Sequence, residues 1–303
     1  MSVALLFSGQ GSQHAAMLPW LDTAAPAQPV LQALGRTLGT PAWRTLLDDG
    51  ACRSRNAVAQ PLVTGTALAA WAVMAPLLPE DPVVVAGYSI GELPACAAAG
   101  VFTPDEALQL AAGRARLMDA AVAGHDTGML AISQVPREQV LAAVPGLECA
   151  IRIDPDNNVY GGSREALQRA EAALAGRAQF KPICVALASH TAWMRPAVAG
   201  FAQLLAALPL AAPRCPVAMN ATGGTLREPA RIALALSAQL AQAVQWDACM
   251  AAVAERRPGC VLEIGGGQAL ARMWATRHPD IPARSLDDFR SPEGAADWVR
   301  RQG

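Results

Sequence analysis

The feature that most constrains the fold is the segment of residues 83–92, Val-Val-Val-Ala-Gly-Tyr-Ser-Ile-Gly-Glu. Its apolar, β-branched start predicts a buried strand, and the alanine-rich residues 93–99 predict a helix after it. Between them, Gly87 and Gly91 flank Ser89 as Gly-x-Ser-x-Gly, a pattern that holds a serine in a strained strand-to-helix turn with its hydroxyl exposed. The five-residue pattern alone also arises by chance in a chain this rich in glycine and alanine. The strand and the helix around it favour Ser89 as a nucleophile.

The composition indicates a globular protein of enzyme size. The chain has 303 residues, 52% of them hydrophobic, and a formal net charge of -1, so it can bury a sizeable core and has no charge bias towards nucleic acid. Its longest apolar run, residues 67–78, contains Pro76 and is shorter than the roughly 20 residues that span a bilayer. The first residues lack a basic region before their apolar stretch, which favours a strand over a signal peptide. We expect a cytoplasmic protein without a membrane partner.

The cysteines indicate neither a disulfide framework nor a metal site. They are odd in number and scattered, and no two form a Cys-x-x-Cys pair. We therefore expect reduced thiols and no metal. The seven positions are Cys52, Cys96, Cys149, Cys184, Cys215, Cys249 and Cys260.

Residues 3–7 predict a short buried strand that runs into the loop Ser8-Gly9-Gln10-Gly11-Ser12-Gln13. In an open α/β sheet, the loops at the carboxyl ends of strands line the ligand crevice, so this loop and the Ser89 turn are expected to meet at one site. The alternative is an ordinary glycine-rich turn. Apolar spacing predicts covering helices over residues 30–38 and 62–78, with Pro61 in the first turn of the second.

A strong helix start follows at Thr103, which is expected to act as N-cap and to form a capping box with Glu106. The helix is predicted to run to about residue 122. Arg114 falls on its apolar stripe, whereas Arg116 falls on its polar face. A guanidinium that points into the core needs an anion, and the pattern leaves two candidates open, an internal carboxylate or a substrate.

The periodicity changes between residues 125 and 187, where strands and helices follow one another in the order βαββαβ of the ferredoxin-like split pattern. We predict an α/β fold in which a larger α/β-hydrolase-like domain with a parallel sheet, residues 1–124 and 188–303, carries this small ferredoxin-like domain as an insertion. The predicted strands are residues 128–134, 149–153, 159–162 and 180–186, and the predicted helices are residues 136–144 and 164–176.

After the insertion, residues 187–190 are expected to open a helix, residues 216–220 and 261–264 to form strands, and residues 232–243 to form a helix. Three glycines follow the last strand. They lack the ending of a P-loop and the spacing of a dinucleotide fingerprint, so we interpret them as a tight turn.

A serine nucleophile needs a general base, and the chain has four histidines, His14, His125, His190 and His278. His278 lies in a turn-like Arg-His-Pro-Asp segment and His125 in a Gly-His-Asp junction, so both are expected to be solvated. His190 follows a predicted strand and stands near a helix start, the same placement as Ser89. His190 is therefore the favoured base.

The whole set of motifs resembles the malonyl-CoA:acyl-carrier-protein transacylases, over nearly the full chain. The resemblance implies that Ser89 is acylated by malonyl-CoA with His190 as its base, and that a carrier-protein thiol then takes the malonyl group. The matching segments are residues 7–13, Gln60-Pro61, residues 87–92, residues 113–118, Ser189-His190, Asn220, Gln239 and residues 244–246.

The same resemblance implies the remaining site residues. Arg114 would form a bidentate pair with the malonyl carboxylate, and the backbone amides of Gln10 and Ile90 would form an oxyanion hole. Supporting roles fall to Gln60, Asn220 and Gln239, the last of which would orient His190. Malonyl-CoA is then a substrate, and no permanently bound cofactor is implied.

Some positions depart from the family pattern. Tyr88 replaces a histidine, Ser8 and Gly266 replace prolines, and Arg152 and Asp154 stand where the fatty-acid enzymes often carry asparagines. The segments 87–92, 189–191, 269–273 and 284–294 look most like the transacylase subunit of malonate decarboxylase. This resemblance implies that the protein primes that enzyme, whose carrier protein bears an arm derived from dephospho-CoA.

The alternative is a fatty-acid or polyketide malonyl transacylase. Arg152 and Asp154 are expected to contact CoA or the carrier arm, or else to be plain surface charges.

Two other classes are disfavoured. An α/β-hydrolase esterase would need a His-Gly-Gly-type oxyanion loop, which the chain lacks, and a late histidine, which would make His278 the base. A non-catalytic docking subunit would not need to retain Ser89, His190 and Arg114 together.

Overall fold

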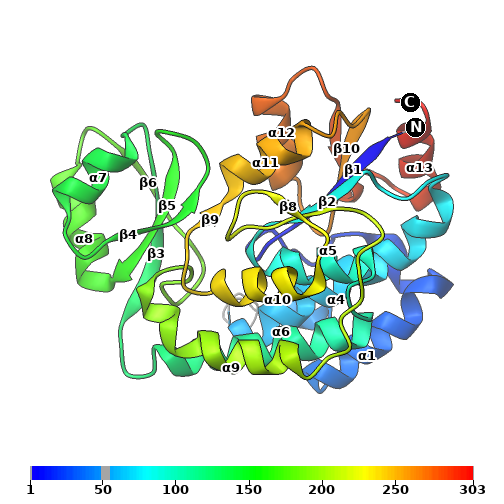
Figure 1. Ribbon diagram of the computed structural model, residues 1–303, viewed down its shortest axis with the longest axis horizontal. Coiled ribbons are helices and arrows are strands. Elements are labelled where there is room, and N and C mark those ends of the chain that lie inside the picture. The colour runs from blue at the N-terminus through cyan, green and yellow to red at the C-terminus, as the bar shows by residue number, and fades with distance from the viewer. Residues whose placement is uncertain (1, 49–54, 303) are drawn as a thin grey trace.

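The computed structural model describes residues 2–48 and 55–302 and contains two sheets (Figure 1). Five strands of the larger sheet are parallel, and β8 pairs antiparallel with β7 at one edge. In sheet order the strands are β11 (Ala283–Ser285), β10 (Cys260–Ile264), β1 (Val3–Phe7), β2 (Val84–Gly87), β7 (Val217–Ala218) and β8 (Thr225–Leu226).

Strand β1 lies inside this sheet, between β10 and β2, and all its residues are buried. Leu5 and Phe7 belong to one apolar core, whereas Ala4 and Leu6 belong to a second. Successive side chains of a strand point to opposite faces, so both faces of the sheet must be covered. This double coverage explains why residues 3–7 are apolar without alternation.

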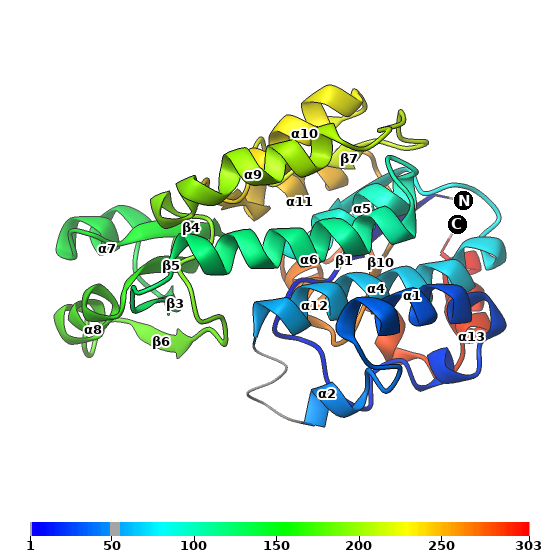
Figure 2. The same cartoon turned by 90° about the horizontal axis from the view of Figure 1, so that it is seen from below.

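Helices line both cores. α6 and α9 pack side by side, as Figure 2 shows, and the capping box of Thr103 with Glu106 forms at the start of α6 as predicted. The first core is lined by α1 (Gln28–Leu38), α4 (Asn56–Met74), α5 (Glu92–Ala99), α6 (Pro104–Ala121), α9 (Arg195–Ala206), α10 (Pro229–Ala238) and α13 (Pro292–Arg300). The second core is lined by α11 (Trp246–Ala254) and α12 (Ala269–Arg277). Shorter pieces are α2 (Thr45–Asp48) and the 3₁₀ helices η1 (Pro19–Asp22), η2 (Ala25–Ala27), η3 (Ala75–Leu77), η4 (Ser89–Gly91), η5 (Ala192–Met194) and η6 (Leu286–Asp288).

Helix α4 begins at Asn56, earlier than the apolar spacing predicts, so Pro61 lies inside the helix and not in its first turn. A proline there removes a hydrogen bond to the carbonyl four residues back. That carbonyl belongs to Ala57, which is exposed, so water can replace the lost donor. The start of the helix is held by Asn56, whose Nδ2 donates to Asp119 Oδ1 of α6 at 2.7 Å.

Residues 56–77 make up α4 and η3. By length and composition alone, this continuous helical segment is long and apolar enough to cross a membrane. In the structure, 83% of this apolar window is buried, and α4 packs against α1 and α6. A helix that is apolar on all sides has this environment when it lies in the core of a folded protein.

The smaller sheet confirms the predicted βαββαβ order. Its strands lie in the order β6-β3-β5-β4-β9, and β9 (Val244–Gln245), which comes from much later in the chain, pairs in parallel with β4. In chain order the other elements are β3 (Thr127–Ser133), α7 (Arg137–Ala143), β4 (Glu148–Arg152), β5 (Asn158–Ser163), α8 (Arg164–Ala173) and β6 (Gln179–Pro182).

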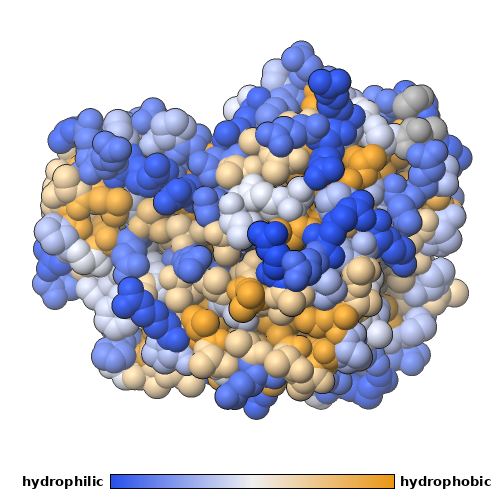
Figure 3. Space-filling model, viewed as in Figure 1, coloured by the Kyte–Doolittle hydropathy of each residue, from blue (hydrophilic) through white to orange (hydrophobic). Residues whose placement is uncertain are grey.

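The two faces of the smaller sheet have different neighbours. Leu130 and Tyr160 pack with α7 and α8, whereas Met129 and Ile151 belong to the core shared with the larger sheet. The space-filling view shows an indentation between the part that carries α7 and α8 and the rest of the molecule (Figure 3). Strand β6 ends earlier than predicted, because a turn in which the N–H of Val185 donates to the carbonyl of Ile183 at 2.8 Å leads the chain away from the sheet.

Six cysteines of residues 2–48 and 55–302 are free thiols, and Cys52 lies outside the described residues. The described residues contain no cluster of three or more His, Cys, Asp and Glu side chains that could hold a metal ion.

Candidate active site

Ser89 lies in the predicted turn between β2 and α5, with a backbone φ of 54°. A positive φ is uncommon for a residue with a side chain and needs support from its surroundings. Part of that support is steric, because a Cβ at Gly87 would lie 2.0 Å from the carbonyl oxygen of Gly91. The turn can therefore form only with glycine at that position, as the motif predicts.

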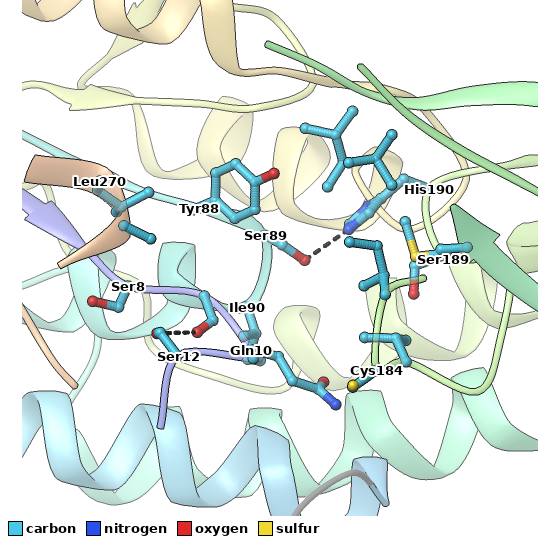
Figure 4. A pocket seen from close by; sticks show the side chains of 18 of the residues that line it. Ser8, Gln10, Ser12, Tyr88, Ser89, Ile90, Cys184, Ser189, His190 and Leu270 are labelled. Atoms are coloured by element: carbon cyan, nitrogen blue, oxygen red, sulfur yellow. Dashed lines mark hydrogen bonds between the residues drawn. The ribbon is translucent and has the colours of Figure 1, made fainter. Parts of the chain in front are cut away.

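His190 is the histidine that meets Ser89. Its Nε2 lies 2.7 Å from Ser89 Oγ (Figure 4), and its Nδ1 lies 2.7 Å from the backbone oxygen of Gln239. A carbonyl oxygen only accepts hydrogen bonds, so Nδ1 carries the proton and Nε2 offers its lone pair to the serine hydroxyl. The pair is therefore arranged for proton transfer from Ser89.

The segment around His190 differs from the predicted helix start. His190 has a φ of 63° and lies in a turn before η5. Its backbone N–H donates to the oxygen of Leu240 at 2.9 Å. The backbone oxygens of Gln239 and Leu240 thus both accept hydrogen bonds from His190, and α10 ends at Ala238, earlier than predicted. Helix α10 therefore ends just before the residues whose carbonyl oxygens accept hydrogen bonds from His190.

Burial and, after it, the positive charge of Arg114 lower the pKa of His190 to about 3, against the opposing effect of the hydrogen bond to Gln239. His190 is 2% exposed. The neutral imidazole, which is the form that can accept a proton, is therefore the resting form at neutral pH.

The other three histidines lie elsewhere. His14 pairs with Asp287 at 2.8 Å, and His125 is exposed and packs against the ring of Trp193. His278, which was expected to be solvated, is half-buried, with its ring 4.5 Å from that of Trp274. Because His278 does not line the cleft that contains Ser89, it cannot serve as the base that an esterase would require.

Arg114 points inward as predicted and is 3% exposed. Its NH1 donates to Gln60 Oε1 and its NH2 to Gln239 Oε1, each at 2.8 Å. Within residues 2–48 and 55–302, no carboxylate forms an ion pair with this guanidinium, so its direct partners are neutral amides. Burial lowers the pKa of Arg114 to about 10, and the charge of Glu92 opposes that shift. The side chain thus stays charged at neutral pH.

Asn220 and Gln239 hold the backbone of the serine turn. The N–H of Ser89 donates to Asn220 Oδ1, and Asn220 Nδ2 donates to the oxygen of Gly87, each at 2.8 Å. Gln239 Nε2 donates to the oxygen of Ser89 at 2.8 Å. The backbone of Gln239, and not its side chain, orients His190, while its side chain connects the serine turn to Arg114.

Gln10 and Ile90 both line the cleft beside Ser89 (Figure 4). Gln10 belongs to the loop after β1, and Ile90 lies in the first turn of η4, where backbone N–H groups have no acceptor within the helix. The loop and the serine turn therefore meet at one site, as expected for loops at the carboxyl ends of adjacent parallel strands.

The cleft has a volume of about 290 Å³ and is enclosed by both sheets. Its lining includes Arg114 and the serine turn. The small sheet and the chain after it contribute Met129, Ile151 and residues 181–185, and α12 contributes Leu270. Its wall is largely apolar, so charges inside it act through a low dielectric.

Two departures from the family pattern, Tyr88 and Ser8, have physical explanations here. Tyr88 lines the cleft and packs edge-on against Trp246, with ring centroids 5.1 Å apart. Ser8 Oγ donates to Glu263 Oε1 at 2.8 Å, and Glu263 Oε2 accepts from the N–H of Ala271 in the first turn of α12 at 2.8 Å. Burial raises the pKa of Glu263 to about 7. Glu263 thus connects the loop that contains Gln10 to α12.

The structure shows the surroundings of Arg152 and Asp154, which were expected to contact CoA or the carrier arm, or else to be plain surface charges. Neither lines the cleft. Asp154 Oδ1 accepts from the N–H groups of Asp156 and Asn157 at 2.9 and 2.8 Å, so it stabilises a local turn. Arg152 is half-buried, and its Nε has no hydrogen-bond partner.

Sequence reasoning missed Glu92, which is 0% exposed. Its Oε1 accepts from the N–H of Asn220 at 2.5 Å and its Oε2 from Gln239 Nε2 at 2.6 Å. Burial raises its pKa to about 8, while these two donors and the charge of Arg114 oppose the rise. A glutamate that ends the serine motif and opens an apolar helix was the signal in the sequence.

The comparisons with known proteins agree with this geometry. The chain matches the model of the acyl transferase domain over residues 4–275. It is 33% identical over 296 residues to the malonyl CoA-acyl carrier protein transacylase of Mycobacterium tuberculosis, covering 94% of this chain and 96% of that protein. It is 29% identical over 302 residues to the protein of the same name from Escherichia coli, covering 94% of this chain and 96% of that one.

Solved structures show the same fold. MCAT from Mycobacterium tuberculosis matches with a TM-score of 0.89 at 31% identity, over 99% of each chain. A malonyl-transacylase in complex with its type II polyketide acyl-carrier protein matches with a TM-score of 0.89 at 27% identity, over 98% of this chain and 99% of that chain. The chain therefore belongs to the acyl transferase domain family and is an acyltransferase of its malonyltransferase type.

Proposed function

We propose that this protein transfers a malonyl group from CoA to the thiol of a carrier protein, through an ester on Ser89. The observation that carries the proposal is Arg114, a buried guanidinium that lines the same cleft as Ser89 and His190 and is held by neutral amides. A malonyl group differs from most acyl groups by a free carboxylate, and arginine binds a carboxylate through two parallel hydrogen bonds. The names of the relatives support the same substrate.

In the proposed reaction, His190 Nε2 takes the proton of Ser89 Oγ as the oxygen attacks the thioester carbonyl. The backbone N–H groups of Gln10 and Ile90 stabilise the resulting oxyanion. The C–S bond then breaks, and the CoA sulfur leaves with the proton from His190. In the second half, the carrier thiol gives its proton to His190 and its sulfur attacks the ester carbonyl. The C–O bond to Ser89 then breaks, and His190 returns the proton to Ser89 Oγ.

Two carrier proteins are candidates for the acceptor. The relatives from Mycobacterium tuberculosis and Escherichia coli are transacylases of an acyl carrier protein, and this supports the carrier of fatty-acid synthesis as the first candidate. The segments that resemble the malonate decarboxylase subunit support the carrier of that enzyme as the second. Polyketide carriers form a third group, represented by a related solved complex.

The ester intermediate gives the first prediction. After mixing with malonyl-CoA and quenching in acid, mass spectrometry should find one malonyl group on the peptide that contains Ser89, because acylation precedes arrival of the carrier. The adduct should be absent in Ser89→Ala. The same yield of adduct in that variant would disprove the role of Ser89.

The state of His190 gives a second prediction, which concerns the free protein. Because burial and the charge of Arg114 lower the pKa of His190 to about 3, its imidazole should remain neutral when the pH falls from about 7.5 to 5, a range in which an unperturbed histidine becomes protonated. NMR of ¹⁵N-labelled histidine measures this directly, and His190→Asn assigns the signal. Protonation of that signal near pH 6.5 would contradict the predicted shift.

Selectivity for a carboxylate gives a third prediction. Arg114→Ala should raise the barrier for malonyl transfer by about 2 to 5 kcal/mol, the range for removing one partner of a buried charge pair. Acetyl transfer should lose far less, because an acetyl group offers no carboxylate. Arg116→Ala is the matched control, since Arg116 is exposed on the same helix. Equal losses for malonyl-CoA and acetyl-CoA would assign Arg114 a structural role.

The acceptor gives a fourth prediction. With both carriers present at equal concentration, malonyl transfer should favour the fatty-acid carrier with its phosphopantetheine arm over the malonate decarboxylase carrier. Intact-protein mass spectrometry of the two carriers measures the split. A clear preference for the decarboxylase carrier would assign the protein to malonate decarboxylase and leave Ser89, His190 and Arg114 in their proposed roles.

A further inference from the structure

We propose that Glu92 is a positioning residue that makes the site selective for acyl groups with a carboxylate, because it fixes the orientation of the Gln239 side chain that holds Arg114. The inference rests on the function proposed above and extends it. Glu92 lies behind the wall of the cleft, so it acts through Gln239 and not on the substrate.

The side chains of Glu92 and Gln239 differ in hydrogen-bonding capacity. Both oxygens of Glu92 accept hydrogen bonds, Oε1 from the N–H of Asn220 and Oε2 from Gln239 Nε2, and this is the pattern of an ionised carboxylate, the form that dominates above its raised pKa of about 8. An amide, in contrast, donates from nitrogen and accepts at oxygen. Gln239 Nε2 donates to Glu92 Oε2 at 2.6 Å and to the oxygen of Ser89 at 2.8 Å. Both N–H groups of the amide are thus used on this side. Its oxygen must face the opposite way, where it accepts from Arg114 NH2 at 2.8 Å.

The reversed orientation of the Gln239 amide is energetically unfavourable. If the Gln239 amide turned over, its oxygen would face the carboxylate of Glu92 and its nitrogen would face the guanidinium of Arg114. Acceptor would then meet acceptor at one end, and donor would meet donor at the other. In a buried site such unsatisfied contacts are strongly unfavourable. The charge on Glu92 therefore selects one of two amide orientations that have nearly the same shape.

The orientation of the Gln239 amide also determines how Arg114 is held. In the observed orientation, amide oxygens hold both terminal nitrogens, NH1 through Gln60 and NH2 through Gln239. A bidentate pair with a carboxylate needs the planar guanidinium in a defined orientation. With the amide of Gln239 reversed, only Gln60 would still accept from Arg114, and the guanidinium would lose half of its support. Binding of a carboxylate should weaken, whereas the chemistry at Ser89 should not depend on this contact.

Glu92 has a second contact with a different consequence. Its Oε1 accepts from the N–H of Asn220 at 2.5 Å, and the side chain of Asn220 accepts from the N–H of Ser89. Loss of this contact affects the nucleophile, and with it every acyl group alike. The two contacts can therefore be separated by comparing acyl groups with and without a carboxylate.

The test is Glu92→Gln in the full-length protein, with acylation of Ser89 by malonyl-CoA and by acetyl-CoA measured in single turnover above the Glu92 pKa of about 8, where the carboxylate is ionised. The oxygen of the substituted amide is held by the N–H of Asn220, so its nitrogen faces Gln239, where it meets a donor in the observed orientation of Gln239 and favours the reversed one. We expect the malonyl-over-acetyl ratio of acylation rates to fall on the order of tenfold, the effect of one unsatisfied buried group. We also expect Glu92→Gln to cause little further loss of the ratio in an Arg114→Ala background, since both changes act on the same contact.

Glu263→Gln is the matched control, because Glu263 is also a fully buried glutamate that accepts two hydrogen bonds, but it has no contact with Gln239. It should lower both acylation rates by the same factor. Glu92→Asp keeps an acceptor-only group and should retain most of the ratio. If Glu92→Gln does not fold, Gln239→Leu should remove the ratio in the same way and again be non-additive with Arg114→Ala.

Equal loss of both rates in Glu92→Gln, or additivity with Arg114→Ala, would overturn the inference and leave Glu92 a purely structural residue. The proposed function fails separately. It fails when the unsubstituted protein has no preference for malonyl-CoA and Arg114→Ala leaves the ratio unchanged.

Discussion

The arrangement of the site depends on the close approach of the Ser89 turn to the carboxyl end of β1. A Cβ at Gly91 would lie 2.3 Å from the oxygen of Phe7, and the N–H of Tyr88 donates to that same oxygen at 3.0 Å. The backbone of the turn thus lies directly on the end of the strand. Because β1 and β2 are parallel neighbours, the loop after β1 reaches the same edge of the sheet, and Gln10 comes beside the nucleophile without any further element.

Behind this turn, buried polar groups are connected in one network. The carboxylate of Glu92 accepts from Asn220 and Gln239, and these residues hold the serine backbone, His190 and Arg114. Buried polar and charged groups are costly without partners, and the Gln239 amide lowers that cost because it hydrogen-bonds both the Glu92 carboxyl group and the Arg114 guanidinium. The network satisfies most of its own donors and acceptors, so it can hold a serine at positive φ in an apolar environment. This rigidity is what a reaction that relies on positioned donors requires.

Much of this arrangement was predictable from local patterns. The serine turn, the capping box of α6, the inward direction of Arg114 and the βαββαβ order each depend on residues close together in the sequence. What could not be predicted depends on distant partners. Asn220 and Gln239 lie 128 and 147 positions from Glu92, and α10 ends early because His190 takes the carbonyls after it. For Asp154 the sequence leaves a ligand contact and a plain surface charge both open, and the partners that its side chain has in the structure are its immediate neighbours.

The charges of the site also connect substrate choice with the base. Arg114 is one of the causes that lower the pKa of His190, after burial itself. In the proposed reaction, the malonyl carboxylate pairs with Arg114 and offsets its positive charge, so the imidazolium that forms during acylation meets less repulsion. An acetyl group leaves that charge uncompensated. In this proposal, the carboxylate that pairs with Arg114 also makes His190 a stronger base when a malonyl group is bound, which couples substrate binding to the chemical step.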